Sequence, residues 1–129
     1  MDSLALTKSL EDYLEMIHML QKEGGKVRVK DMSDALSVKM PSVVKAITLL
    51  KEQDLVVQEP YGDIELTPVG EKVAKKILAR HLLLREFLIN LGVSTKIANE
   101  DACLMEHILS PETLGRIEEF NQNVKTNLK

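Results

Sequence analysis

Three side chains that commonly bind transition metals lie close together near the carboxyl end of the chain: Cys103, Glu106 and His107. They are spaced i, i+3 and i+4, so on a helix they share one face, with Cβ atoms about 5 to 6 Å apart. A thiolate, a carboxylate and an imidazole that point to one place can hold a transition-metal ion. The first hypothesis from the sequence is therefore a metal site on this segment.

The same segment also allows a purely structural interpretation. Apolar side chains recur at helical spacing beside the three polar ones: Ala98, Ala102, Met105 and Leu109. On this interpretation Cys103 is a small buried hydrophobic residue, while Glu106 and His107 form a solvated edge. Ligands from elsewhere in the chain have to decide between the two.

Other potential ligands are distant in the sequence, and each has a simpler explanation. Asp12 and Glu15 are spaced i, i+3 on a predicted helix, where a Ser9-x-x-Asp12 capping box accounts for Asp12 and simple exposure accounts for Glu15. His81 lies on an apolar stripe, and a lone histidine in such a place is usually a satisfied core residue. His18, one turn after Glu15, is expected at the surface.

The elements that must position these side chains are mostly helices. Apolar spacing predicts helices near residues 10–23, 30–36, 41–50, 71–91, 95–109 and 112–126. Residues 55–58 and 64–66 are typical of two strands around a turn. A helix-turn-helix whose second helix opens with Pro41, followed by a β-hairpin, is a winged helix. We therefore expect a mostly α chain, with a winged-helix domain at 1–70 and an all-α domain at 71–129.

Length and composition limit the class of protein. The chain has 129 residues, 3% aromatic residues and no tryptophan, which is typical of a helical protein of one or two domains. Its single cysteine cannot form an internal disulfide and suits a reducing compartment. The sequence shows neither a signal peptide nor an apolar run of membrane-spanning length, so we expect a cytoplasmic protein with no membrane partner.

Charge is distributed unevenly along the chain. The net charge of −3 argues against general binding of polyanions. The segment from residue 26 to residue 51, however, contains six basic residues and only two acidic ones. The second helix of a helix-turn-helix enters the major groove, so we assign DNA contacts to its early residues Pro41, Ser42 and Lys45. Phosphate contacts are expected from Arg28, Lys30 and Lys39. A solvated cationic face is the alternative, but the coincidence with a winged helix favours binding of double-stranded DNA.

Several separated motifs occur along nearly the whole chain. They are Ser-Leu-Glu-Asp-Tyr-Leu-Glu (9–15), Leu-Thr-Pro-Val-Gly (66–70), Arg-His-Leu-Leu-Leu (80–84), Asp-Ala-Cys-Leu-Met-Glu-His (101–107) and Leu-Ser-Pro-Glu (109–112). In this order they resemble the diphtheria-toxin-repressor family of iron- and manganese-dependent transcriptional repressors. The resemblance implies a homodimer in which a divalent metal, bound between the winged helix and the dimerisation helices, licenses binding to a palindromic operator that controls metal homeostasis genes. The ligands that it implies are Asp12, Glu15, His81, Cys103, Glu106 and His107.

The chain departs from both branches of that family. The iron-sensing branch has a cysteine at the position of Cys103 but a methionine at that of Asp12, whereas the manganese-sensing branch has an aspartate there and a glutamate in place of the cysteine. The resemblance therefore implies a hybrid site for Fe(II) or Mn(II), to which Co(II), Ni(II) or Zn(II) can bind in vitro. Arg85 and Asn99 replace ancillary ligands of the family, which leaves a second metal site incomplete. The sequence ends at Lys129, so we expect no SH3-like domain, as in the manganese branch.

Two other functions fit parts of the sequence. An enzyme would use Cys103 as a nucleophile with His107 or His81 as its base. The sequence offers no oxyanion hole and no phosphate-binding glycine loop, so we expect no catalytic activity. A metal-independent winged-helix regulator that responds to a small organic ligand or a partner protein is the other alternative, and it would bind its operator in the presence of chelators.

Overall fold

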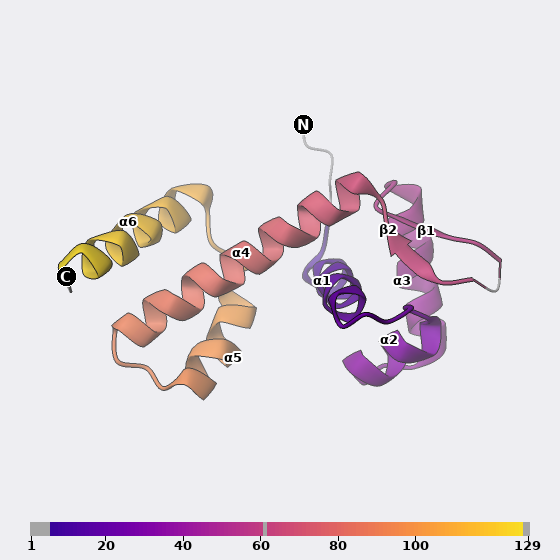
Figure 1. Ribbon diagram of the computed structural model, residues 1–129, viewed down its shortest axis with the longest axis horizontal. Helices are drawn as coiled ribbons and strands as arrows, with labels where there is room; N and C mark the ends of the chain where they lie inside the picture. Colours follow the sequence, from indigo (N-terminus) through magenta and orange to yellow (C-terminus); the bar gives the residue numbers. More distant parts are fainter. Residues whose placement is uncertain (1–5, 61, 128–129) are drawn as a thin grey trace. The chain divides into compact units, whose positions relative to one another are not determined.

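The computed structural model describes residues 6–60 and 62–127, and it contains the expected helices and hairpin (Figure 1). In chain order the elements are α1 (Lys8–Lys22), α2 (Val29–Leu36), α3 (Met40–Glu52), β1 (Val56–Gln58), β2 (Ile64–Leu66), α4 (Pro68–Asn90), α5 (Thr95–Met105) and α6 (Pro111–Asn127). Two compact units divide the chain, unit 1 up to Lys76 and unit 2 from Ile77, so α4 contributes to both. The predicted boundary between residues 70 and 71 falls in the first turn of the same helix. The expectation of a mostly α chain with a winged helix before a helical part is confirmed.

Unit 1 is built around one apolar core to which each of its first three helices contributes one face. Fully buried side chains include Leu14, Ile17, Met32, Val43, Ile47, Leu50, Leu55 and Ile64. Along the helices they recur every three or four residues, which is the spacing that predicted the helices. The strands β1 and β2 pair antiparallel, with Val56 opposite Leu66. The Ile64 N–H donates to the Val27 carbonyl at 2.7 Å, so the segment before α2 also attaches to the hairpin.

The turn between α2 and α3 depends on two serines. Ser37 ends α2 in the left-handed region, with φ 57° and ψ 44°, which few residues other than glycine adopt freely. The Ser33 hydroxyl donates to the Val38 carbonyl, and the Val38 N–H donates back to the Ser33 carbonyl at 3.1 Å. Pro41 lies in the first turn of α3, where a missing N–H removes no helical hydrogen bond. These local contacts set the direction in which α3 leaves α2.

The junction between β2 and α4 approaches the end of α3 closely. The Thr67 hydroxyl donates to the Asp54 carbonyl at 2.7 Å and accepts the Gly70 N–H at 2.9 Å. The Thr67 N–H donates to the Leu55 carbonyl at 3.0 Å. A Cβ atom on Gly70 would lie 1.9 Å from that same carbonyl oxygen, so the backbone contact requires glycine.

Unit 2 consists of the second part of α4 together with α5 and α6, which both pack against it (Figure 1). Its buried centre contains one residue from each helix, namely Leu84, Ala102 and Ile117. Asn121 of α6 is 3% exposed, and its amide is satisfied on both sides. Its oxygen accepts from Asn90 Nδ2 at 3.2 Å, and its nitrogen donates to the Leu83 carbonyl at 3.1 Å. These bonds attach α6 to α4.

Large apolar side chains remain exposed on unit 2. They are Leu82, Ile89, Leu91, Ile97, Leu104, Ile108 and Phe120. Among the described helices, none combines the length and the apolar character needed to cross a bilayer. Exposed apolar surface of this kind commonly marks a protein–protein interface.

His18 is buried, not at the surface as the sequence suggested. Only 4% of the residue is exposed, and its Nε2 atom has no hydrogen-bond partner among the described residues. Burial, and then the nearby Lys22, lowers the pKa of His18 from its usual 6.5, with a smaller opposing effect from Glu71. The folded protein therefore holds this imidazole neutral near neutral pH.

Gly70→Ala is expected to lower the free energy of unfolding by about 1 to 3 kcal/mol or more, the usual range for overpacking a tight site. The added methyl group would press on the Leu55 backbone, which cannot move aside as a flexible side chain can. Gly115→Ala in α6 is the matched control, because nothing lies within 4 Å of a Cβ there and a helix gains up to about 1 kcal/mol from losing a glycine. Urea denaturation measures both variants, and equal stabilities would contradict the proposed packing.

His18→Leu is expected to reduce the loss of stability of the metal-free protein in acid. Below about pH 6.5 the unfolded chain takes up a proton on His18 that the folded state accepts only at lower pH, so the wild-type free energy of unfolding falls through this window. Leucine binds no such proton. Urea denaturation at about pH 7.5 and about pH 5 should show the variant gaining on the wild type toward acid. A difference that does not change with pH would be the opposite result.

Candidate metal centre and nucleic-acid interface

His81 on α4 and Glu106 at the end of α5 come together although 25 residues separate them in the sequence. The distance from His81 Nδ1 to Glu106 Oε1 is 3.0 Å. The Glu106 side chain has no exposed surface, and that of His81 is 19% exposed. The two helices bring these residues together because Leu84 and Ala102, one turn away from them, pack in the same buried cluster. Unit 2 thus pairs two of the predicted ligands.

The helix that carries the predicted metal segment ends earlier than expected. We predicted a helix to residue 109, but α5 ends at Met105. The Glu106 N–H still donates to the carbonyl four residues before it at 3.0 Å, whereas those of His107 and Ile108 donate to carbonyls three residues back, at 3.4 and 3.1 Å. This tighter turn removes the α-helical i, i+4 relation assumed for Cys103 and His107. Cys103, which is partly buried, keeps its i, i+3 relation to Glu106, whose backbone is still helical at φ −61° and ψ −18°.

Asp12 and Glu15 lie one turn apart on α1, in unit 1. The cap of this helix is Thr7, whose hydroxyl accepts the N–H three residues later at 3.1 Å, so the predicted capping box of Ser9 and Asp12 is wrong. Asp12 instead forms an ion pair with Lys8 at 2.9 Å, and Glu15 is half-buried. Helix capping therefore does not explain an aspartate at this position.

The donor set has the chemistry of a divalent transition-metal site. It combines carboxylates, imidazoles and a thiol, which together suit iron, manganese and related ions. Two donor atoms that bind one ion at right angles, at roughly 2.1 Å, stand about 3.0 Å apart. His81 Nδ1 and Glu106 Oε1 are 3.0 Å apart, which is an ordinary hydrogen-bond distance and also close enough for both atoms to bind one ion. Within each unit as described, no three His, Cys, Asp or Glu side chains are grouped to hold an ion, and the six predicted ligands are divided between the units.

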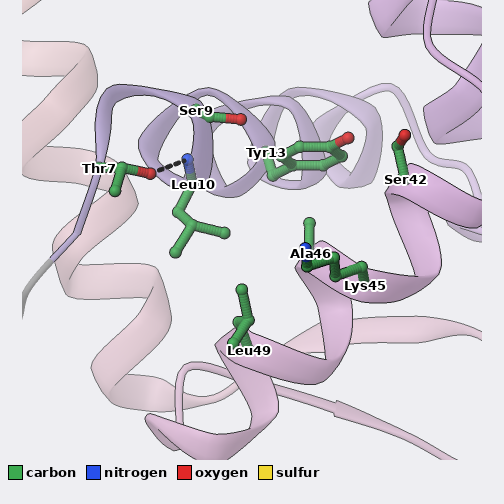
Figure 2. Close-up of a pocket in the computed structure, with 8 residues that line it drawn as sticks. All are labelled: Thr7, Ser9, Leu10, Tyr13, Ser42, Lys45, Ala46 and Leu49. Atoms are coloured by element: carbon green, nitrogen blue, oxygen red, sulfur yellow. Dashed lines mark hydrogen bonds between the residues drawn. The ribbon is translucent and has the colours of Figure 1, made fainter.

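The residues predicted to contact DNA are all exposed on unit 1. They are Arg28, Lys30, Lys39, Pro41, Ser42 and Lys45. Ser42 and Lys45 lie on the side of α3 that faces α1, where they line a cleft of about 270 Å³ (Figure 2). Its other lining residues are Thr7, Ser9, Leu10, Tyr13, Ala46 and Leu49. Met40, Val44 and Thr48 of the same helix are exposed as well, and their i, i+4, i+8 spacing, which the sequence already shows, places them on one face of α3.

Arg28 has partners within unit 1 that hold it beside the wing. Its Nε lies 3.4 Å from Asp63 Oδ1 in the hairpin loop, and its backbone N–H donates to Asp31 Oδ2 at 3.0 Å. The arginine side chain is 67% exposed, so the pair contributes only about 0 to 1 kcal/mol to stability. Its consequence is positional, because it connects the start of α2 to the wing.

The two parts of the chain match two family models. Residues 5–64 match the model for the iron-dependent repressor N-terminal DNA-binding domain, and residues 67–129 match the model for the iron-dependent repressor metal-binding and dimerisation domain. The HTH-type transcriptional regulators MntR of Geobacillus kaustophilus and Bacillus subtilis are 40% and 38% identical to the chain, over 90% of the chain and 82% of each relative. A solved manganese-dependent transcriptional repressor in complex with manganese has a TM-score of 0.81 and 30% identity over 88% of this chain and 52% of that one. The chain therefore spans about half the length of that structure.

Proposed function

The chain belongs to the iron-dependent repressor family, and from this premise we propose that it is a metal-dependent transcriptional repressor. It senses Fe(II) or Mn(II) and, as a homodimer, binds a palindromic operator in double-stranded DNA to control metal homeostasis genes. The proposed role is not catalytic. It requires a location in the cytoplasm, where the operator DNA lies. The observation that supports it most strongly is the pairing of His81 with the buried Glu106 in the part that matches a metal-binding model.

We assign the metal ligands to both units. Unit 1 contributes Asp12 and Glu15, and unit 2 contributes His81, Cys103, Glu106 and His107. When bound, a divalent cation supplies the positive charge that balances these carboxylates and the thiolate. The carboxylate of Glu106 is removed from water. Its attraction to that charge is therefore screened less than the attraction of the more exposed ligands. His81 is already within one ligand-to-ligand distance of it.

Division of the ligands between two units is the proposed switch. Asp12 and Glu15 can share an ion with the other ligands only in arrangements of the units that bring the two sets together. In a homodimer such an arrangement sets the separation of the two α3 helices, which must match half-sites about one turn of DNA apart or a multiple of it. The exposed apolar side chains of unit 2 support an interface between two copies. Metal and DNA then favour the same state, and each tightens the other by the same factor.

Metal removal is expected to weaken operator binding about 5- to 150-fold, the usual range for coupled binding sites. The operator is first selected from random DNA with the Mn(II)-loaded protein, and binding is then followed anaerobically by fluorescence anisotropy with and without a chelator. Glu106→Gln should abolish the response to metal, whereas Glu100→Gln, a 56% exposed position on the same helix, should keep it. Operator binding that ignores the chelator would instead favour a metal-independent regulator.

Substitutions in the two halves of the hybrid ligand set are expected to change metal preference in opposite directions. Cys103→Glu replaces a soft ligand with a hard one and should favour activation by Mn(II) over Fe(II) or Co(II). Asp12→Met removes a hard ligand and should do the reverse. Asp12 does not cap α1, so its variant should keep the helical content of the wild type, which circular dichroism checks. If both variants retain the wild-type order of activation in the operator-binding assay, these residues do not set selectivity.

A further inference from the structure

The exposed face of α3 consists of two strips with different chemistry. Residues three or four apart on a helix lie one above the other. One strip, spaced i, i+4 and i+8, consists of Met40, Val44 and Thr48. The other, spaced i, i+3 and i+7, consists of Ser42, Lys45 and Leu49, and it lines the cleft against α1 (Figure 2).

The strip of Met40, Val44 and Thr48 is apolar and open to solvent. Met40 is 46% exposed and Val44 is 52% exposed, whereas Val43 beside it is fully buried. The Thr48 hydroxyl donates to the Val44 carbonyl at 2.9 Å. Because its proton is used in this hydrogen bond, the Thr48 hydroxyl does not act as a donor to a DNA base.

Val44 gains little from folding. An exposed β-branched residue is less favourable in a helix than alanine or lysine, because its χ1 rotamers are restricted there. About half of the residue is also outside the core to which Val43, Ala46 and Ile47 of the same helix contribute. Its two methyl groups are therefore available for contact with another molecule.

We infer that Val44, with Thr48 beside it, recognises thymine through the C5 methyl group in the major groove. The inference rests on the proposed function, in which α3 is the helix that enters the groove. Thymine is the base that presents a methyl group there, and apolar side chains recognise it by contact. Val44 lies in the second turn of α3, within the amino-terminal part of a recognition helix that contacts bases.

The charges around the strip identify DNA as its occupant. Lys39 occupies the position before the first turn of α3, and Lys45 and Lys51 lie on the same helix, with Glu52 as its one acidic residue. A cationic border attracts phosphates on either side of a base pair, and a purely apolar protein partner has no use for it. On this arrangement the lysines position the helix, and Val44 supplies sequence information.

Replacing single thymines by deoxyuridine tests this inference, because it removes the methyl group and leaves base pairing intact. In the operator selected for the Mn(II)-loaded wild type, we expect at least one thymine in each half-site whose replacement weakens binding about fourfold, the effect of one buried methyl group. In Val44→Ala the same replacement should have almost no effect. Val57→Ala, which changes a valine that is 49% exposed on β1, should keep the wild-type difference.

The outcomes separate this inference from the proposed function. If the wild type binds the operator in a metal-dependent way but does not distinguish thymine from deoxyuridine, or if Val44→Ala distinguishes them as the wild type does, the inference is overturned and the proposed function stands. If no metal-dependent DNA binding is found, both are overturned. Val44→Thr keeps the shape of the side chain and one methyl group, and should retain part of the discrimination, so it answers the question if the alanine variant does not fold.

Discussion

The burial of the Glu106 carboxylate is the constraint around which unit 2 is organised. Its side chain has no exposed surface, and taking an ionised carboxylate out of water costs several kcal/mol, roughly, unless a partner compensates it. His81 supplies such a partner at 3.0 Å. A divalent cation bound by both side chains would place two positive charges beside this carboxylate. Leu84 and Ala102 pack in one buried cluster, and this apolar contact holds His81 and Glu106 together.

In unit 1, contacts at both ends of α3 hold this partly exposed helix in one orientation. The Ser33 and Ser37 turn directs α3 on one side, and the contact of Gly70 with the Leu55 carbonyl closes the unit on the other. With α3 held at both ends, its buried face is filled and its outer face is left to Lys45 and Val44. Phosphate contacts position a protein on DNA and base contacts provide specificity, so a helix that carries lysines beside the strip of Met40, Val44 and Thr48 suits both tasks.

Periodicity and turn residues were enough to predict the helices, the hairpin and the order of the two parts, because each of these depends on residues close together in the sequence. What could not be predicted depends on contacts between distant segments. The sequence of α1 does not predict the burial of His18, because this residue lies at the border between the polar and the apolar face of the helix. The end of α5 at Met105 was missed because Ser110 and Pro111 were the first recognisable stop signals. Thr7, not Ser9, caps α1, which shows that two hydroxyl residues two positions apart leave a helix start ambiguous.

The net charge of the chain limits how a metal can control it. One divalent ion adds two positive charges, and ligation removes the proton of Cys103, so a net charge of −3 changes by about one unit and stays negative. The basic residues between 26 and 51 carry the same charge with or without metal, and their attraction for phosphates is screened beyond about 8 Å at physiological ionic strength. General electrostatics therefore cannot provide a 5- to 150-fold response of the size expected for coupled sites. In the proposed mechanism the ion acts through the arrangement of the two units, so that specificity for a palindrome, more than general affinity for DNA, is the property under metal control.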